Sequence, residues 1–474
     1  MMVQNFSYLL FVLLIWLIAL LVRAPKGKQA LLLIASYLFY ATWGHGFLII
    51  LILSSVMNYM LGEMLRRKPT TGRLWFGISL NVLLLALFKY LPPLAGSVGT
   101  QASGLGFILH HILMPVGISF WTFQALSYLF DIYREEELNP TLVEFCLYLA
   151  FWPTVLAGPV CRLPEMLPQF RKMTNPSWGD VENGVRRIVF GLFMKLVLAQ
   201  ILLAGLNPGE GVADGFDQIS QGWGGIDVWL LAIGFGFQLF FDFAGYSHIV
   251  IGTARLFGLR LEENFDRPYL STTPSAFWTR WHMSLSFWIR DYVFMSLATV
   301  KREYWWRLFA LVLSMTLFGL WHGAALTFIL WGLYHGLLLA AHRLWQQQRR
   351  RFNISLLPAI ETFISWGLTF TCISLGWIFF RAHDLHQALT MFSTIFSPGS
   401  YRRMALRPNF YLVTMTVIAS YFIYCGVEAL FKYLETRTWL NRLIWLISPV
   451  RYTAILLLII IWSKQEAVFV YFQY

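Results

Sequence analysis

Long apolar runs recur along this chain and constrain its fold more than any other feature. A helix that crosses a bilayer needs about 17–25 predominantly apolar residues. Only 13% of the residues are charged, against about 25% in soluble proteins. We therefore predict an all-α, polytopic integral membrane protein with about 11–13 transmembrane helices, plus re-entrant or interfacial helices. The predicted spans are residues 6–22, 29–43, 46–62, 74–91, 112–130, 141–157, 184–206, 226–247, 305–321, 323–341, 358–379, 409–430 and 445–463.

Charged loops predict how the first spans are oriented. Basic residues follow the first span at Arg23, Lys26 and Lys28 and recur in "RRKPTTGR" (66–73), whereas the loop at 92–106 carries no charge. Lys and Arg concentrate in cytoplasmic loops, so we expect both basic loops inside and the N-terminus outside. The first span lacks the basic start of a signal peptide, and we expect it to be retained.

Two longer stretches are too polar to span a membrane. The first, 158–183, begins "AGPVCRLPEMLPQFRK", and its prolines discourage a continuous helix. The second, 248–304, is both aromatic and charged. This composition favours interfacial or re-entrant helices over a free loop.

The second stretch contains one predicted amphipathic helix. We place it between residues 275 and 294. Thr272 or Thr273 is the expected N-cap, because a hydroxyl can accept a hydrogen bond from an early backbone N–H. Pro274 then falls in the first turn, where its missing N–H costs nothing.

The net charge of +12 does not indicate nucleic-acid binding. The basic residues lie in short clusters beside the spans, such as Arg343 with 349–351. Membrane topology and anionic headgroups account for such clusters. Membrane lipids, and no nucleic acid, are the expected partners. The scattered cysteines, with no CxxC pair, are expected to be packing residues.

The segment "LFGLWHGAALTFILWGLYHG" (317–336) carries the main catalytic candidate, His322. An ionisable residue at membrane depth is costly and suggests function. Neutral imidazole has one acceptor nitrogen, so His322 could take a proton from an attacking hydroxyl. Gly323 leaves room for a substrate and Trp321 could wall the site. The alternative is a core histidine bound to a carbonyl, or a helix-end residue near the interface.

His282 is the second candidate, with Arg280 close by in sequence. On the predicted helix His282 would share a face with Ser286, and Ser286 with Arg290. Such a face could line a water-filled cavity, or it could be the wet side of an interfacial helix.

A polar row follows one face of the span 226–247. Gln238, Asp242 and Tyr246 are spaced four residues apart in "FQLFFDFAGYSHIVIG", so they lie on one helix face. The row could face a substrate, or it could make helix–helix hydrogen bonds. Asn264 in "ENFDRPYL" could bind a polar head group or tie down a loop.

The remaining histidines are weaker candidates for a metal site, and we predict none. His110 and His111 are neighbours, which is poor helical geometry for two ligands. His383 and His386 are spaced like ligands but lack a carboxylate cluster. His335 shares a helix face with His342, as packing or interface residues would.

Several segments together resemble one family, the membrane-bound O-acyltransferases, and within it the bacterial alginate O-acetyltransferase branch. They occur in the family's order over most of the chain. The segments are "LMPVGISFWTFQALSYLFDIYR" (113–134), "FWPTVLAGPVCR" (151–162), "FFDFAGYSHIVIGTARLFGLRLEENFDRPYL" (240–270), "FWTRWHMSLSFWIRDYVF" (277–294), "LFGLWHGAALTFILWGLYHG" (317–336) and "FVYFQY" (469–474).

The resemblance implies a single membrane domain over 1–474, with N-terminal helices at 1–110, a catalytic core at 111–342 and C-terminal helices at 343–474. It implies a cytoplasmic tunnel that meets an outer funnel near the catalytic histidine. The family's invariant histidine falls on His322, and its second histidine on His282. Trp321, Arg280, Asp242, Tyr246 and Asn264 are then candidate substrate-binding residues.

The resemblance also implies transfer of an acetyl group from a cytoplasmic thioester, acetyl-CoA, with no permanently bound cofactor. A periplasmic or membrane-anchored acyltransferase of the SGNH type would pass the group to a surface polysaccharide. Peptidoglycan, cellulose or teichoic acid (by D-alanyl transfer) are alternative acceptors. The alternative of another class is a transporter that exports an acyl carrier without chemistry.

Overall fold

The protein is built from helices. The computed structural model describes residues 1–92, 113–134, 137–207, 209–218, 222–352, 357–434 and 438–462. Within these ranges there is no β-strand, only an isolated bridge between Phe265 and Trp281. The all-α prediction is confirmed. The C-terminal segment 469–474 and the pair His110–His111 lie outside the described residues.

Seven helical segments of the described chain are long and apolar enough to cross a membrane. Other helices at predicted spans are α1 (Phe6–Leu21), α2 (Pro25–Ala41), α7 (Ile118–Tyr133), α18 (Leu326–Phe352) and the apolar end of α22 (Thr438–Trp462). The chain is therefore a multi-pass membrane protein, while the total of about 11–13 spans stays a prediction. The seven are α3 (His45–Arg67), α4 (Thr71–Lys89), α10 (Trp178–Phe193) with η2 (Met194–Ala199) and α11 (Gln200–Ala204), α13 (Gly225–Leu256), α17 (Tyr304–His322), α19 (Pro358–Arg381) and α21 (Pro408–Leu434).

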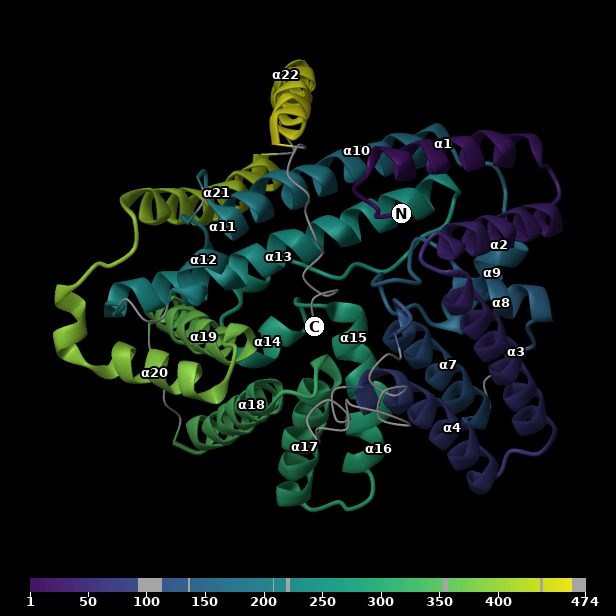
Figure 1. Ribbon diagram of the computed structural model, residues 1–474, viewed down its shortest axis with the longest axis horizontal. Coiled ribbons are helices and arrows are strands. Elements are labelled where there is room, and N and C mark those ends of the chain that lie inside the picture. The colour runs from purple at the N-terminus through teal and green to yellow at the C-terminus, as the bar shows by residue number, and fades with distance from the viewer. Residues whose placement is uncertain are drawn as a thin grey trace, which may run out of the picture. The chain divides into compact units, whose positions relative to one another are not determined.

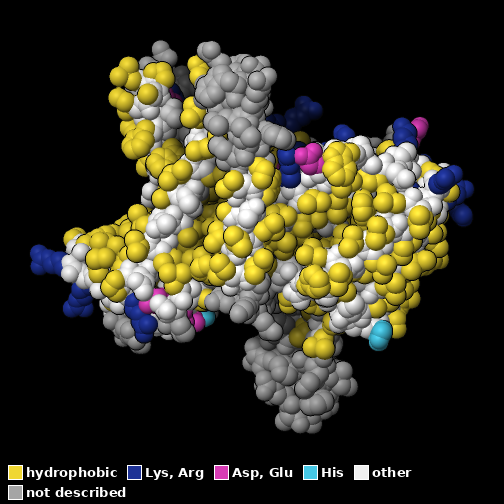
Figure 2. Space-filling model, turned by 90° about the horizontal axis from the view of Figure 1, so that it is seen from above, with side chains coloured by type: hydrophobic (Ala, Val, Ile, Leu, Met, Phe, Trp, Pro, Cys, Tyr) yellow, Lys and Arg dark blue, Asp and Glu magenta, His cyan; other side chains and the backbone are white. Residues whose placement is uncertain are grey.

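On the face shown in Figure 2, hydrophobic side chains cover much of the surface, and Lys and Arg lie mainly near its margins. Among the hydrophobic side chains of the described residues, Leu53 and Leu83 are 63% and 66% exposed. A soluble protein seldom exposes so broad an apolar surface. Lipid contact explains it here.

Two compact units make up the chain. Unit 1 comprises residues 1–188, 247–264 and 284–296, and its helices α3, α4 and α7 pack side by side (Figure 1). Its helices are α1 (Phe6–Leu21), α2 (Pro25–Ala41), α3, α4, α7 (Ile118–Tyr133), α8 (Leu142–Ala150), α9 (Leu163–Arg171), most of α10, the end of α13, α15 (Met283–Trp288) and the π-helix η5 (Ile289–Phe294).

Helix α8 is shorter than the predicted span 141–157. It begins with a capping box, in which the Thr141 hydroxyl accepts from the Glu144 backbone N–H and the Glu144 carboxylate accepts from the Thr141 N–H. It ends at Ala150 because Pro153 disfavours helical conformation in the residue before it, and a buried turn follows. The chain therefore does not cross the membrane as one helix here.

Unit 2 comprises residues 189–246, 265–283 and 297–474. Asp227, near the start of α13, anchors it: the buried carboxylate accepts hydrogen bonds from the backbone N–H groups of Gly224 and Ala405 and from the Tyr411 hydroxyl. Besides helices already given, unit 2 contains α12 (Val212–Asp217), the 3₁₀ turn η4 (Pro268–Leu270), α14 (Pro274–Trp278), α18 (Leu326–Phe352), α20 (Leu385–Phe396), η6 (Pro398–Arg402) and α22 (Thr438–Trp462); the short α16 (Met295–Ala298) starts in unit 1.

Glycines allow α17 and α18 to pack backbone to backbone (Figure 1). A Cβ on Gly319 would lie 2.2 Å from the Phe328 carbonyl oxygen, and one on Gly332 would lie 2.3 Å from that of Met315. No side chain fits at such distances. This close hairpin fixes where the end of α17, and so His322, is held.

The predicted helix over 275–294 is wrong in its continuity. Its start is confirmed: Thr273 caps α14 by accepting from the Ala276 N–H at 3.0 Å, and Pro274 is the first residue. The helix then breaks before α15, because His282 has φ of +42°, which a right-handed helix cannot contain. The predicted sharing of a helix face between His282 and Ser286 does not hold.

Candidate active site

His322 is the last residue of α17 and only 5% exposed. The chain leaves the helix at Gly323, and a Cβ there would lie 2.7 Å from the Phe328 ring. Glycine is thus required for the loop to fold back tightly onto α18. The side chain of His322 faces the protein interior and not lipid.

Aromatic rings surround the His322 imidazole. Four of them have centroids 4.7–5.1 Å from that of His322, and Phe328 lies at 6.3 Å. These apolar walls exclude bulk water from the imidazole. The surrounding residues are Phe318 and Trp321 from α17, Trp331 from α18 and Phe380 from α19.

His335 lies on the other side of this cluster, where it is buried as the predicted packing alternative requires. It is fully buried, with its ring 5.0 Å from Trp331 and 5.2 Å from Trp278. Among the described residues neither ring nitrogen has a hydrogen-bond partner. Gly376 makes room for it, since a Cβ there would lie 2.6 Å from Nε2. The sequence signal for this position was the segment "WGLYHG" (331–336), in which His335 follows Trp331 by four residues, about one helical turn.

His282 is fully buried in the break between α14 and α15. The Phe243 ring meets it edge-on at 4.6 Å. The bridge between Phe265 and Trp281 and the hydrogen bond from the Asp266 N–H to the Arg280 carbonyl hold the chain on either side of the break. A left-handed conformation costs a non-glycine residue about 1–3 kcal/mol and tends to occur at functional sites.

Burial lowers the pKa of His282 from 6.5 to about 3, so the folded protein holds it neutral. Since the unfolded chain binds a proton near pH 6.5, stability is full above that pH and falls by about 1.4 kcal/mol per unit as the pH drops toward 3. In His282→Asn, which keeps a residue tolerant of positive φ, we expect this part of the acid sensitivity to disappear. Unfolding free energy measured from pH 7 to 5 checks it; equal slopes in both proteins would contradict it.

Asp242 forms an ion pair with Lys195 inside unit 2. The two side chains are 5% and 0% exposed. Lys195 lies in the π-helix η2, an irregularity common at functional sites. Gly245 of α13 lets the two helices approach closely, because a Cβ there would lie 2.9 Å from the backbone nitrogen of Lys195. The sequence reasoning missed Lys195, although a lone lysine in the apolar span "GLFMKLVLAQ" was a signal.

The other predicted substrate-binding residues fall in different surroundings. Tyr246 is buried one turn beyond Asp242, and Arg280 is partly buried. Asn264 belongs to unit 1, where its side chain donates to the Ser247 hydroxyl and accepts from Ser284 at 2.6 Å. These bonds favour the loop-tying role for Asn264.

Within unit 2 the two candidate histidines are linked by tryptophans. Trp281, adjacent to His282, lies 4.9 Å from Trp377. Trp377 stacks on Trp331 at 6.3 Å, and Trp331 meets His322 at 5.1 Å. The three indoles therefore form a continuous buried aromatic row, with a candidate histidine near each end.

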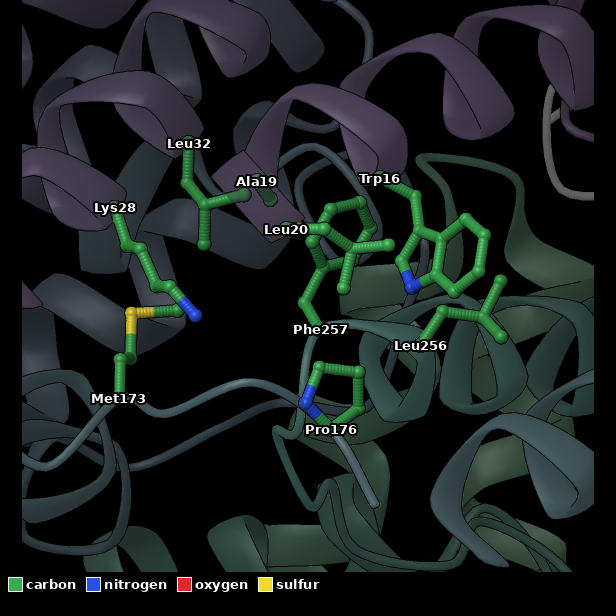
Figure 3. A pocket seen from close by; sticks show the side chains of 9 residues that line it. All are labelled: Trp16, Ala19, Leu20, Lys28, Leu32, Met173, Pro176, Leu256 and Phe257. Carbon is green, nitrogen blue, oxygen red and sulfur yellow. The ribbon is translucent and has the colours of Figure 1, made fainter. Parts of the chain in front are cut away.

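Within the described ranges no three His, Cys, Asp or Glu side chains gather in a way that could hold a metal ion. Figure 3 shows a cavity in unit 1 that Lys28 points into, where Lys28 donates to Asn175 at 2.5 Å. Its volume of about 10 Å³ holds at most one water molecule.

Sequence comparisons agree with the resemblance noted above. The model of the membrane-bound O-acyltransferase family matches residues 70–382. A probable alginate O-acetylase of Pseudomonas syringae is 35% identical over 386 residues, covering 80% of this chain and 71% of the relative. A peptidoglycan O-acetyltransferase of Helicobacter pylori is 31% identical, covering 77% and 73%. A teichoic acid D-alanyltransferase of Streptococcus thermophilus is 33% identical, covering 58% and 65%.

Proposed function

This chain belongs to the membrane-bound O-acyltransferase family, and from that membership we propose that it takes an acetyl group from cytoplasmic acetyl-CoA and passes it across the inner membrane for O-acetylation of a surface or secreted polysaccharide. It is a multi-pass O-acyltransferase. The observation that carries the proposal is the burial of His322 among aromatic rings at the end of α17, inside the region matched by the family.

His322 is the proposed general base. Its neutral imidazole takes the proton of the accepting hydroxyl as that oxygen attacks the thioester carbonyl carbon. The tetrahedral intermediate collapses, the carbon–sulfur bond breaks, and the imidazolium returns its proton to the departing thiolate. The acceptor is either the glycan hydroxyl or a nucleophile that relays the acetyl group to a partner. Exclusion of water by the surrounding rings limits wasteful hydrolysis.

Stabilising the oxyanion requires a hydrogen-bond donor near the carbonyl oxygen. We assign this role to His282, Arg280 or the Trp321 indole. Trp321 touches the His322 ring at 4.7 Å, which favours it among the three. Asp242, Tyr246 and Asn264 remain proposed contacts for substrate, with the bonds of Asn264 and the ion pair of Asp242 also serving the fold.

An alginate-like polysaccharide is the proposed acceptor. Relatives named as probable alginate O-acetylases reach 34–35% identity over about four fifths of this chain. Peptidoglycan is the second candidate, favoured by the Helicobacter pylori relative. Cellulose and, by D-alanyl transfer, teichoic acid remain alternatives, the latter through the Streptococcus thermophilus relative.

The proposed partner is a periplasmic or membrane-anchored acyltransferase of the SGNH type, which would complete transfer outside the cell membrane. We place the N-terminus in the periplasm, from the basic loops at 23–28 and 66–73. One membrane domain over 1–474 is proposed, of which the family model matches 70–382.

The experiment that tests this function compares ester-linked acyl groups on surface polysaccharides from cells with and without the protein. We expect acetyl esters to be lost from one glycan and restored by the wild-type gene. Identifying that glycan decides between alginate-like polymer and peptidoglycan. Unchanged acetylation of every surface glycan would overturn the proposal.

A further inference from the structure

A second cavity, separate from the histidine cluster, opens in unit 2 between α18 and α19. Its volume is about 520 Å³, within the range of small-molecule sites. One face of each helix lines it, at Leu338, His342 and Trp345 on α18 and at Ser365 and Thr369 on α19, and residues 272–274 close its floor. We call it the wedge cavity.

The wedge cavity changes from charged to apolar along its length. At one end Arg349 and Glu361 form a bidentate ion pair across the two helices, with the second contact at 2.7 Å. Leu338, Leu368 and Cys372 contribute the apolar wall. A ligand that fits must itself be amphiphilic, with a polar head toward Arg349 and an apolar body along the helices.

Charge favours an acidic head. Arg349 lines the cavity, opposite the carboxylate of Glu361. Arg343 and Arg351 lie in the same half of α18 without lining the cavity, and they add to the positive charge around it. Arg binds phosphate through geometry that matches its planar donors. The hydroxyls of Thr273, Ser365 and other wall residues can donate to further phosphate or glycerol oxygens.

The mouth of the cavity favours a lipid over a soluble phosphate compound. Trp345 and Leu368 line it and are 56% and 63% exposed. Farther along α18, toward the apolar end of the cavity, Leu337 is 54% exposed. In a membrane chain such surfaces contact acyl chains, and tryptophan beside arginine is typical of the membrane interface. The opening therefore faces lipid.

We propose that the wedge cavity between α18 and α19 binds the head of an anionic phospholipid, with its phosphate at Arg349 and its acyl chains along Leu337 and Leu368. This site does not depend on the reaction at His322. It adjoins α14, whose Trp278 contacts His335 at 5.2 Å, so a bound lipid would lie beside the segment that supports the histidine cluster.

Cys372 provides a direct readout of occupancy. It contributes to the cavity wall and is partly exposed, whereas Cys146, Cys161 and Cys425 are buried. In nanodiscs, N-ethylmaleimide labelling of Cys372 is followed by peptide mass spectrometry, with and without phosphatidylglycerol in phosphatidylcholine. When the lipid exceeds its Kd about tenfold, labelling is expected to slow by about tenfold. Ala341→Trp, which fills the cavity, should slow labelling in either lipid.

Matched variants assign the effect to the ion-pair end. Arg349→Gln with Glu361→Gln keeps the charge balanced and is expected to raise the Kd for phosphatidylglycerol about tenfold. Arg351→Gln, in the same basic cluster but outside the cavity, should protect as wild type does. Glycerol 3-phosphate and acetyl-CoA are added separately as soluble phosphate probes.

Protection by phosphatidylglycerol that is lost in the double variant supports the site. Protection by acetyl-CoA and not by the lipid, or equal protection in both lipid compositions, overturns it. None of these readouts uses acetyl transfer, so failure of the lipid site and failure of the proposed reaction are distinguishable.

Discussion

His322→Ala is expected to reduce acetyl transfer by about 10²–10⁴-fold, the usual contribution of a general base. The imidazole is nearly buried, and four aromatic rings lie within 5.1 Å of it, so bulk water has little access to take its place. The measurement is turnover of acetyl-CoA by purified protein in nanodiscs, together with acetyl esters on the glycan of complemented cells.

His386→Ala is the matched control, because His386 lies on the exposed side of α20. It should retain wild-type turnover and thermal midpoint. His322→Ala is expected to lower the thermal midpoint, because it removes a buried ring from the aromatic cluster and leaves a cavity. Turnover is therefore compared at a temperature at which both variants are folded. If His322→Ala kept full turnover, the base assignment would be wrong. Full glycan acetylation without turnover by the purified protein would favour the transporter or a scaffold role.

Of the substitutions proposed for this protein, those that break the Lys195–Asp242 ion pair are expected to lower the free energy of unfolding most. Lys195→Met removes the cation that pairs with the buried Asp242 carboxylate. Asp242→Leu removes the anion that pairs with the buried Lys195 ammonium. Loss of one partner of a buried pair costs about 3–5 kcal/mol. The combined variant leaves no unpaired charge and should recover most of that stability, as replacement by apolar residues often does. Unfolding in detergent, arranged as a double-mutant cycle, measures the coupling.

The exposed pair Arg186–Glu182 on α10 is the control, with both side chains about half exposed. Neutralising it should change stability by less than about 1 kcal/mol. Additive effects at Lys195 and Asp242 would show that the pair is not coupled. Activity of the stable double variant addresses a separate question: a stable but inactive protein would support the proposed substrate contact of Asp242, and full activity would make the pair structural.

The described structure follows the sequence closely where length and hydrophobicity alone decide. Helices α1, α4, α17 and α19 coincide with predicted spans within a few residues, because a bilayer requires uninterrupted apolar helices. The Thr273 cap and the position of Pro274 were predicted correctly because helix starts have short-range residue preferences. His322 was chosen as the main catalytic candidate because an imidazole in an apolar span is energetically costly.

Other features depend on contacts between distant segments. The break at His282 is held by Phe265 against Trp281, and a helical pattern in the sequence cannot register such a partner. Asp242 was visible as a polar residue, but its pairing with Lys195 joins residues 47 apart in the chain. The early end of α8 follows from a proline turn that the average hydrophobicity of 141–157 conceals.

The sequence by itself determined that this is an all-α membrane protein, which family it belongs to and which histidine is the main catalytic candidate. These depend on composition, local spacing and motif order, which require no knowledge of neighbours in space. Only the tertiary structure decided what surrounds each polar group: the aromatic walls of His322, the burial of His335, the cation at Asp242 and the wedge cavity. Those surroundings set desolvation and pairing, and both are properties of packing and not of any single segment.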